Sequence, residues 1–531
     1  MRKTAIQWQI IGLIGAILIP WYALHDGFWS FRWVSGIFLD PDSASAIAQG
    51  LFHGRWWLLV SLLPLGLSAL VLLVVRDRRK LARLLVIMSV AGLVMIAAQG
   101  FIVARTGPRL FADLFAGSPG ETGQVGFGAG AMVVLFSHLF LLTTGYAGMG
   151  KGRGDAFIVG LIGLIVALVG VFVFFPVAHI LVQAFQASDG SFSLGEFWSR
   201  MASHRIWGLR CLAGAGDCGA AWNSLALAIL TGAGSTLMGL SFALVVTRTR
   251  FRFKPLLRVL TVIPIITPPF VIGLALILLF GRSGALTGLL HDIFGIPKSR
   301  WLYGFWGVYI AQLLSFTPIS FLVLIGVVEG VSPSMEEASQ TLNANRWQTF
   351  KNVSFPLMRP GLANAFLLGF IESLADFGNP LVLGGNLNVL STDIFFAIVG
   401  AVANTGRAAT LAIVLLVMTL GAFLIQRSWV GKKSYATVTG KADSGQHASL
   451  SPGLEKLCYA TALPWAAFTV IVYSMIIFGS FAKLWGYDNS FTLDHYLRAF
   501  SISFNDGIQW TGVAWKSYFT TLTISSISAP L

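Results

Sequence analysis

The chain has 531 residues, of which 56% are apolar, only 11% are charged and three are cysteines, and its net charge is +14. Soluble globular domains carry roughly 25% charged residues, because a surface that faces water needs them. The composition therefore excludes a large soluble enzyme, a disordered chain and a disulfide-stapled secreted scaffold, and it indicates a protein that lies in a lipid bilayer. In such a protein the excess positive charge belongs to cytoplasmic loops and not to a nucleic-acid site.

Long apolar runs predict membrane-spanning helices, since about 20 apolar residues at a rise of 1.5 Å cross roughly 30 Å of hydrocarbon. These runs do not alternate in period two, which excludes barrel strands. We expect an all-α, polytopic helical membrane protein with about 12 spans. The spans are expected approximately at residues 6–22, 56–75, 84–103, 127–146, 156–180, 222–246, 259–280, 305–328, 361–383, 408–425 and 457–481, with a further one starting at 515.

Basic residues predict the orientation, because cytoplasmic loops are enriched in lysine and arginine. If the N-terminus is cytoplasmic, the inner segments hold the larger share of them, including the clusters at 76–83 and 248–258. No small-residue cleavage site follows the first apolar run, so we expect an uncleaved first helix. His138 lies mid-span, where an interhelical hydrogen bond is its expected role. Cys211 and Cys218 fall on the outer side, where a disulfide and two free thiols are equally compatible with the sequence.

A short motif occurs twice, as Asp189-Gly-Ser-Phe-Ser-Leu194 and as Asp488-Asn-Ser-Phe-Thr-Leu493. Each copy follows an apolar span and precedes an outer amphipathic stretch, so we expect a parallel duplication with its axis along the membrane normal. Two unrelated outer loops are the alternative. The expected organisation is a four-span extension at 1–155, a first module at 156–427, a polar cytoplasmic linker at 428–456 and the start of a second module at 457–531, whose copy is incomplete in this chain.

The inner loop after the eighth expected span, residues 332–356, has the pattern of helix, turn, helix. Its signals are Ser332 with Pro333 at a helix start, the alternative capping pair Ser334 and Glu337, the turn residue Asn343, and the second capping pair Asn345 and Gln348. The loop is too polar to span a membrane. A docking element for a cytoplasmic partner and an ordinary loop between spans both fit this pattern.

This loop resembles the EAA motif of permease subunits in ATP-binding-cassette importers, whose pattern is Glu-Ala-Ala, three residues, Gly, nine residues, an aliphatic residue, one residue and Leu-Pro. The matching residues are Glu337, Ala338, Ser339, Asn343, Val353 and Pro356. Asn343 replaces the glycine, and Ser339 and Phe355 are milder departures. The resemblance implies that the loop, within 332–360, fits a groove on a cytoplasmic ATP-binding subunit and transmits its closure to the membrane helices.

Polar groups and prolines at membrane depth mark a candidate translocation path. Glu372 and Asp376 lie one helical turn apart in the ninth expected span. They could face an aqueous path, or they could form a buried hydrogen-bonded pair beside a re-entrant bend at Asn379. Pro264, Pro268 and Pro269 should kink or break the seventh span, and Pro318 should do the same to the eighth.

Four motifs resemble the fused permeases of ferric-iron importers. They are Thr267-Pro-Pro-Phe-Val-Ile-Gly-Leu274, Gly281-Arg-Ser-Gly284, Glu372-Ser-Leu-Ala-Asp-Phe-Gly-Asn-Pro380 and Leu383-Gly-Gly-Asn386. The resemblance implies a multi-pass protein of the bacterial inner membrane that pairs with two ATP-binding subunits and receives iron from a periplasmic substrate-binding protein. Permeases for thiamine, phosphonate, sulfate and polyamines share much of this pattern and stay open as alternatives.

The chain itself shows no site for ATP or a metal ion. Gly145-Tyr-Ala-Gly-Met-Gly150-Lys151 lacks the Ser/Thr of a phosphate-binding loop and follows a membrane helix instead of a strand. No His/Cys cluster has the spacing of a metal site. We therefore expect a non-enzymatic chain that binds no cofactor, with ATP on a partner subunit. An ion-coupled secondary transporter that uses Glu372 and Asp376 is the alternative from a different class.

Overall fold

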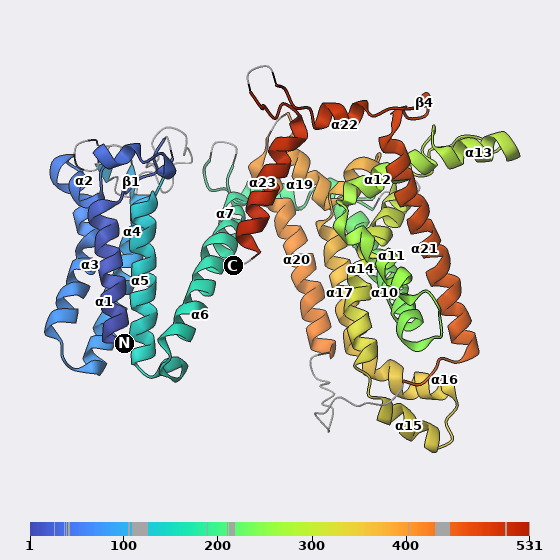
Figure 1. Cartoon of the computed structure of the whole chain (residues 1–531), viewed down its shortest axis with the longest axis horizontal. Helices are drawn as coiled ribbons and strands as arrows, with labels where there is room; N and C mark the ends of the chain where they lie inside the picture. The colour runs from blue at the N-terminus through green and yellow to red at the C-terminus, as the bar shows by residue number, and fades with distance from the viewer. Residues whose placement is uncertain are drawn as a thin grey trace. The chain divides into compact units, whose positions relative to one another are not determined.

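The computed structural model describes residues 1–25, 27–36, 38, 40, 43–104, 107–108, 126–187, 190–209, 211, 218–401, 403–430, 447–504 and 507–529. Within these residues, nine helices are long and apolar enough to cross a membrane. The all-α, polytopic membrane fold is thereby confirmed, whereas the number of about 12 spans stays a prediction. The chain forms two compact units, Met1–Phe197 and Trp198–Leu531, whose elements are labelled in Figure 1.

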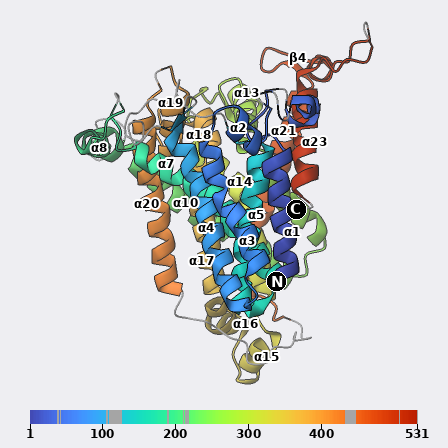
Figure 2. The same ribbon diagram turned by 90° about the vertical axis from the view of Figure 1, so that its left-hand side faces the viewer.

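The first unit is a helical bundle with a short two-stranded ribbon. Its elements are α1 (Arg2–Leu18), α2 (Ala46–Phe52), α3 (Trp57–Val74), α4 (Arg78–Ile102), β1 (Val103–Ala104) antiparallel to β2 (Gly107–Pro108), α5 (Ala129–Gly148), α6 (Ala156–Val169) and α7 (Phe175–Gln183), with 3-10 turns at Phe28–Ser30, Arg32–Gly36 and Lys151–Gly154 and a π-helical turn at Gly170–Phe174. α8 (Leu194–Met201) crosses the boundary between the units. Figure 2 shows α1, α3, α4 and α5 side by side.

Small residues let α4 and α5 approach closely, as is common between helices in lipid. A Cβ at Gly92 would overlap the imidazole ring of His138. The His138 side chain is fully buried, and neither ring nitrogen has a hydrogen-bond partner among the described residues. The predicted interhelical hydrogen bond is therefore wrong, because the ring faces the flat surface of a glycine that carries no polar side chain.

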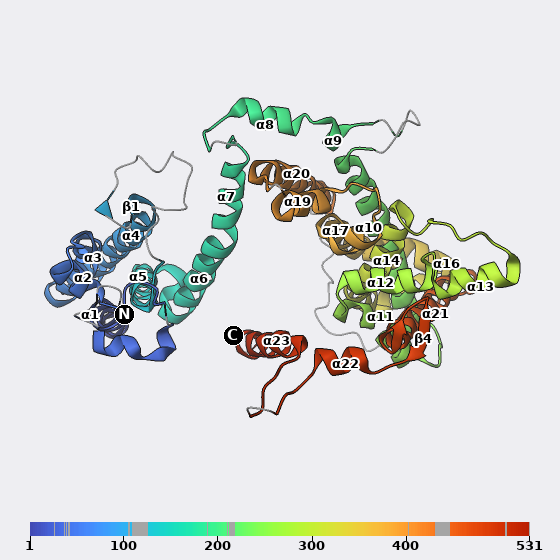
Figure 3. The same ribbon diagram turned by 90° about the horizontal axis from the view of Figure 1, so that it is seen from above.

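The second unit contains a longer series of helices and a two-stranded antiparallel ribbon. Its elements are α9 (His204–Trp207), α10 (Ala220–Arg248), α11 (Lys254–Ile266), α12 (Pro269–Phe280), α13 (Ala285–Phe294), α14 (Phe305–Glu329), α15 (Pro333–Thr341), α16 (Arg346–Thr349), a π-helical turn (Phe350–Ser354), α17 (Phe355–Ala375), α18 (Gly378–Leu383), α19 (Leu390–Val399), α20 (Thr405–Val430), α21 (Pro452–Ser480), β3 (Ala482–Leu484) antiparallel to β4 (Asp488–Phe491), α22 (Asp494–Ala499) and α23 (Val513–Ser528). Figure 3 shows α10, α14 and α17 grouped together.

The core of the second unit lies where α10, α14 and α17 cross. Phe242 and Phe321 are buried there and meet edge to face, with ring centroids 6.4 Å apart. A Cβ at Gly239 would lie 2.8 Å from the backbone nitrogen of Phe321, so glycine is needed for the two helices to come this close. At the inner-loop end of these helices, α15 and α16 form a separate projection, opposite to α13 and α22 (Figure 1).

Prolines act differently in the two helices where breaks are predicted. α11 ends at Ile266, Thr267 and Pro268 are extended, and α12 begins at Pro269. The predicted break of the seventh span is confirmed. α14, in contrast, continues through Pro318 for all its 25 residues. Of the predicted kink or break at Pro318, the break does not occur, because a single proline removes only one backbone donor and helical bonding continues on both sides of it. A kink at this position stays a prediction.

The two copies of the repeated motif have the same local construction. Ser193 N–H donates to Phe185 O and Thr492 N–H donates to Phe481 O, each at 2.8 Å. In each copy this phenylalanine stacks on the phenylalanine of the motif, with ring centroids 5.8 and 5.3 Å apart. Asp189 lies outside the described residues. The wider duplication stays a prediction.

The division into compact units differs from the predicted domains. α6 packs on α5, since Cβ atoms at Gly160 and Gly163 would touch Phe140 and Thr143. The compact units therefore separate after Phe197, whereas the predicted boundary after residue 155 follows the sequence repeat and stays a prediction. Of the predicted linker at 428–456, residues 431–446 lie outside the described residues. Cys211 and Cys218 form a disulfide, which decides between the two states left open by the sequence, and Cys458 is a buried free thiol.

Candidate functional site

The inner loop folds into a helical hairpin, as its capping signals predict. Asn343 ends the first helix with a φ of 63°, the left-handed conformation predicted for it. Asn345 and Gln348 form the predicted capping box, with both hydrogen bonds at 2.9 Å. Ser339 and Thr349 join the two arms through their hydroxyl groups at 3.2 Å. The loop is thus a hairpin with a locally encoded turn.

The start of the first arm differs from the expected capping. Ser332 occupies the cap position before Pro333, but its side chain makes no capping bond and instead meets the Ser334 hydroxyl at 2.8 Å. The alternative capping pair of Ser334 with Glu337 does not form either, because α15 begins at Pro333 and Ser334 therefore lies inside the helix and not at its cap.

The residues predicted for the coupling loop divide between an outer and an inner face. Glu337, Ala338 and Asn343 are exposed, whereas Ser339, Val353 and Pro356 are half-buried. Large apolar side chains share the outer face, among them Leu342, which is 84% exposed, and Trp347. An exposed surface that combines a carboxylate with large apolar groups is suited to contact another protein.

Glu336, next to Glu337 in the chain, faces inward and forms a buried ion pair. The Arg248 guanidinium, at the end of α10, donates from Nη1 to both Glu336 carboxylate oxygens at 2.5 and 2.6 Å. Arg248 Nη2 donates to Val328 O at 3.0 Å, and the Ser354 hydroxyl donates to Glu336 Oε1 at 2.5 Å. The Arg248 and Glu336 side chains are only 3% and 1% exposed. The hairpin is therefore fastened to α10, α14 and the start of α17 through one carboxylate.

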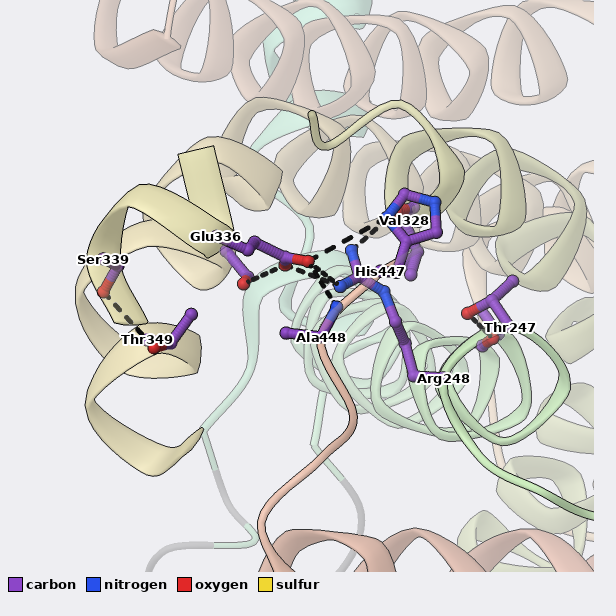
Figure 4. A network of polar contacts seen from close by, with 10 residues as sticks. Thr247, Arg248, Val328, Glu336, Ser339, Thr349, His447 and Ala448 are labelled. Atoms are coloured by element: carbon purple, nitrogen blue, oxygen red, sulfur yellow. Dashed lines mark hydrogen bonds and ion pairs between the residues drawn. The ribbon is translucent and has the colours of Figure 1, made fainter. Parts of the chain in front are cut away.

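The end of the polar linker reaches the same carboxylate (Figure 4). Ala448 N–H donates to Glu336 Oε2 at 2.9 Å, and His447 Nδ1 lies 3.9 Å from that oxygen. Burial, followed by the nearby Arg248 cation, holds the pKa of His447 below its usual value, against the opposing effect of Glu336 and Glu329. These partners were missed in the sequence, where Glu336 appears only as an acid near a helix start. The signal that could have found it is the stripe of Pro333, Glu336 and Ser339, three residues apart on one helix face.

A second polar cluster lies between α14, α17 and α18. Asp376, directly after α17, accepts bonds from Gln312 Nε2 at 3.0 Å and Asn379 Nδ2 at 2.9 Å. Its other oxygen accepts the backbone N–H groups of Gly378 and Asn379 at 3.0 and 3.2 Å. The Gln312 amide oxygen accepts the hydroxyl groups of Thr231 and Ser373. Asp376 is thus held by neutral donors in a buried network.

The structure brings some of the predicted path residues together and leaves one apart. The α11–α12 break packs on α18, since a Cβ at Gly378 would lie 3.4 Å from Phe270 N, next to Pro268 and Pro269. Asp376 and Asn379 share the cluster, and Asp376 N–H donates to Glu372 O at 2.9 Å. The Glu372 side chain is half-buried, and no hydrogen bond among the described residues reaches it. The bonded arrangement therefore includes Asp376 and Asn379 but not the Glu372 carboxylate.

Comparison with known proteins finds a family to which this part of the chain is similar. The family described as "Binding-protein-dependent transport system inner membrane component" matches residues 235–435, which contain the hairpin and Asp376. The molybdenum transport system permease protein ModB of Azotobacter vinelandii is 32% identical over 164 residues, which are 31% of this chain and 71% of that protein. The chain belongs to this family of binding-protein-dependent inner membrane components.

Longer matches connect this inner membrane component with larger permeases. The ferric transport system permease protein FbpB of Actinobacillus pleuropneumoniae is 39% identical over 425 residues, 79% of this chain and 59% of that protein. A relative from Haemophilus influenzae that carries the same FbpB name is 40% identical over 408 residues, 77% of this chain and 62% of its own length. The chain thus spans about three fifths of the length of these two relatives. Among the described residues, no group of three or more His, Cys, Asp or Glu side chains could hold a metal ion.

Proposed function

We propose that this inner membrane component is the transmembrane permease subunit of an ATP-driven, binding-protein-dependent importer. The subunit moves its substrate by alternating access, while ATP is hydrolysed on separate cytoplasmic subunits and a periplasmic binding protein delivers the substrate. The chain itself binds no cofactor, and its N-terminus is cytoplasmic. Family membership supports this proposal, and so do the apolar spans.

The observation that carries the proposal is the division of the hairpin into two faces. Glu336 fastens the inner face through a buried ion pair, whereas Glu337, Ala338 and the apolar Leu342 are exposed on the outer face. A second protein that binds the exposed, partly apolar surface can displace the hairpin, and the buried ion pair transmits this movement to α10, α14 and α17. We propose that the ATP-binding subunit, in two copies, is this second protein.

Purification of the intact complex tests the proposed class. We expect a subunit with a phosphate-binding loop to copurify, and we expect E337Q to lower substrate uptake per ATP hydrolysed while leaving thermal stability unchanged, because Glu337 is exposed. The same substitution at the neighbouring residue, E336Q, tests instead whether the buried ion pair holds the hairpin in place. Uptake that follows a proton gradient in the absence of any ATPase would overturn the proposal in favour of a secondary transporter that uses Glu372 and Asp376.

We further propose ferric iron as the substrate. The support is the identity of 39% over 425 residues with a ferric transport permease, compared with 32% over 164 residues for the molybdenum permease. Deletion of the gene should abolish uptake of radioactive ferric iron and leave uptake of molybdate, sulfate, thiamine, phosphonate and polyamines unchanged. Unchanged iron uptake together with loss of one of the others would reassign the substrate.

A further inference from the structure

We propose that residues 447–450, here named the linker strap, belong to the joint that holds the hairpin at Glu336. Through this joint, movement of the hairpin is coupled to movement of α21. This inference rests on the proposed permease function and extends it. In the sequence these residues belong to a polar linker between two modules, where a flexible tether without a fixed position would be sufficient. The contacts of the strap instead place it inside the joint that Glu336 forms.

The strap is anchored at both ends. Ala448 N–H donates to Glu336 Oε2 at 2.9 Å, so a backbone group of the strap completes the coordination of the buried carboxylate. Leu450 is 3% exposed and packs in the same apolar cluster as Met358 of α17 and Val331 at the base of the hairpin. One hydrogen bond to a charged acceptor and one buried leucine therefore fix a segment of four residues.

The strap leads directly into a rigid element. Ser451 occupies the position directly before α21, which begins at Pro452 and runs for 29 residues. Cys458 and Ala462 of α21 are buried in the cluster that holds Leu450. The chain between Ala448 and Pro452 can extend to at most about 14 Å. Because this connection is short, a displacement of the hairpin should move the start of α21 as well.

One carboxylate thus connects three parts of the second unit. Arg248 ties Glu336 to α10, Ser354 ties it to the start of α17, and Ala448 ties it to α21. The Arg248 guanidinium satisfies the charge of Glu336, and the Ala448 amide satisfies a remaining lone pair that burial would otherwise leave without a partner. The geometry therefore assigns Glu336 the role of a positioning residue for three helices besides α15 and α16, namely α10, α17 and α21.

Backbone substitution at Ala448 tests the strap in the intact complex with its ATPase subunits. A448P removes the donated N–H, A448G keeps it, and S449P introduces the same residue at an exposed position whose N–H makes no bond to the described residues. We expect A448P to reduce substrate transported per ATP hydrolysed by about tenfold, the size of one lost bond to a charged group, with A448G and S449P close to the unmodified protein. Unchanged transport per ATP in A448P would overturn the proposal.

Hydrogen–deuterium exchange provides a readout that does not depend on transport. We expect the amide of Ala448 to be protected in the unmodified protein and to exchange at least about tenfold faster in E336Q, but not in E337Q. Exchange at the unprotected rate in the unmodified protein would overturn the strap. If E337Q leaves transport per ATP unchanged and no ATPase copurifies, the proposed function fails while the exchange result still decides the strap. If E337Q uncouples and A448P does not, the strap alone fails.

Discussion

Glu336 and Asp376 are two of the buried carboxylates among the described residues of the second unit, and their surroundings differ in kind. Glu336 at the base of the hairpin is paired with the Arg248 cation and gathers donors from three separate segments. Among the described residues, Asp376 between α14 and α18 has only neutral donors, and three of its four bonds come from Gly378 and Asn379, just after it in the chain. Glu336 therefore holds distant segments together, whereas Asp376 mainly shapes a local turn.

This difference indicates which of the two sites can transmit movement between helices. A buried ion pair loses several kcal/mol when one partner is removed, since the other charge is left without compensation. The joint at Glu336 should therefore stay closed while the hairpin moves, and it should carry force. A carboxylate in a cage of amide donors can exchange partners at lower cost, because each single bond is worth less than a buried ion pair and an incoming neutral donor can replace it. The cluster at Asp376 is better suited to adjust while α12 and α18 shift.

The largest effect is expected from breaking the ion pair. E336Q leaves the Arg248 guanidinium buried without a counter-charge, so we expect a loss of about 3–5 kcal/mol in stability and a lowered apparent melting temperature in detergent. E337Q is the matched control, since it makes the same chemical change on the neighbouring exposed residue, and it should leave the melting temperature within experimental error.

A double substitution sharpens the same comparison. R248M combined with E336L removes both charges and should recover much of the stability lost in E336Q, because an apolar pair of similar volume needs no counter-charge. Transport per ATP should stay low, since the serine and strap contacts lose their acceptor. Equal melting temperatures for E336Q and E337Q would show that the pair does not hold the hairpin.

The Asp376 cluster should respond less. D376N keeps the shape but turns one acceptor into a donor that faces the amide groups of Gln312 and Asn379. Gln312 cannot simply reverse its amide, because its oxygen accepts bonds from Thr231 and Ser373. We expect D376N to cost about 1–3 kcal/mol, whereas E372Q should stay within about 0.5 kcal/mol. Thermal unfolding of both variants measures the difference, and a larger loss in E372Q would contradict the assignment.

The turn of the hairpin should respond less again. Asn343 has a φ of 63°, which costs a residue with a Cβ about 1–2 kcal/mol and costs glycine nothing. N343V should therefore lower stability by about 1 kcal/mol, while N343G should leave it unchanged or raise it slightly. Apparent melting temperatures decide this, and a loss in N343G equal to that in N343V would show that the asparagine side chain matters more than its backbone.

These contrasts show which features could be predicted from the sequence. The turn at Asn343, the capping box of Asn345 with Gln348 and the break before Pro269 depend on residues within one helical turn, and all three were predicted. The Arg248 partner of Glu336 lies 88 residues away and Ala448 lies 112 residues away. Such pairings depend on how whole helices pack, and no local pattern encodes them.

The same reasoning explains where the expectations differ from the structure. Pro318 was expected to kink or break its helix, but α14 continues through it and is held on both sides by packing against α10 and α17, which the local rule for proline does not include. His138 was expected to find a hydrogen-bond partner, yet the residue that α4 presents to its ring is Gly92. In both cases the neighbouring helix decides the outcome.

The smallest expected effect is a pH dependence at the joint. His447 is packed near Arg248 of α10, Glu336 of α15 and Glu329 at the end of α14, and Glu329 also lies 3.9 Å from Arg258 of α11. Because burial and Arg248 lower the pKa of His447 in the docked strap, the undocked strap binds more protons as the pH falls below the usual value of about 6.5. Docking should therefore be complete above that value and weaken in acid.

H447Q removes the titrating group and should abolish this pH dependence while keeping the Ala448 bond. The measurement is the exchange rate of the Ala448 amide in the unmodified protein divided by that in H447Q at each pH, since the ratio cancels the intrinsic pH dependence of exchange. We expect the ratio to rise as the pH falls from 7.5 to 5.5. A ratio that falls in acid would mean that the protonated ring strengthens the joint by pairing with Glu336. In that case Glu336, and not Arg248, would have the larger effect on the pKa of His447.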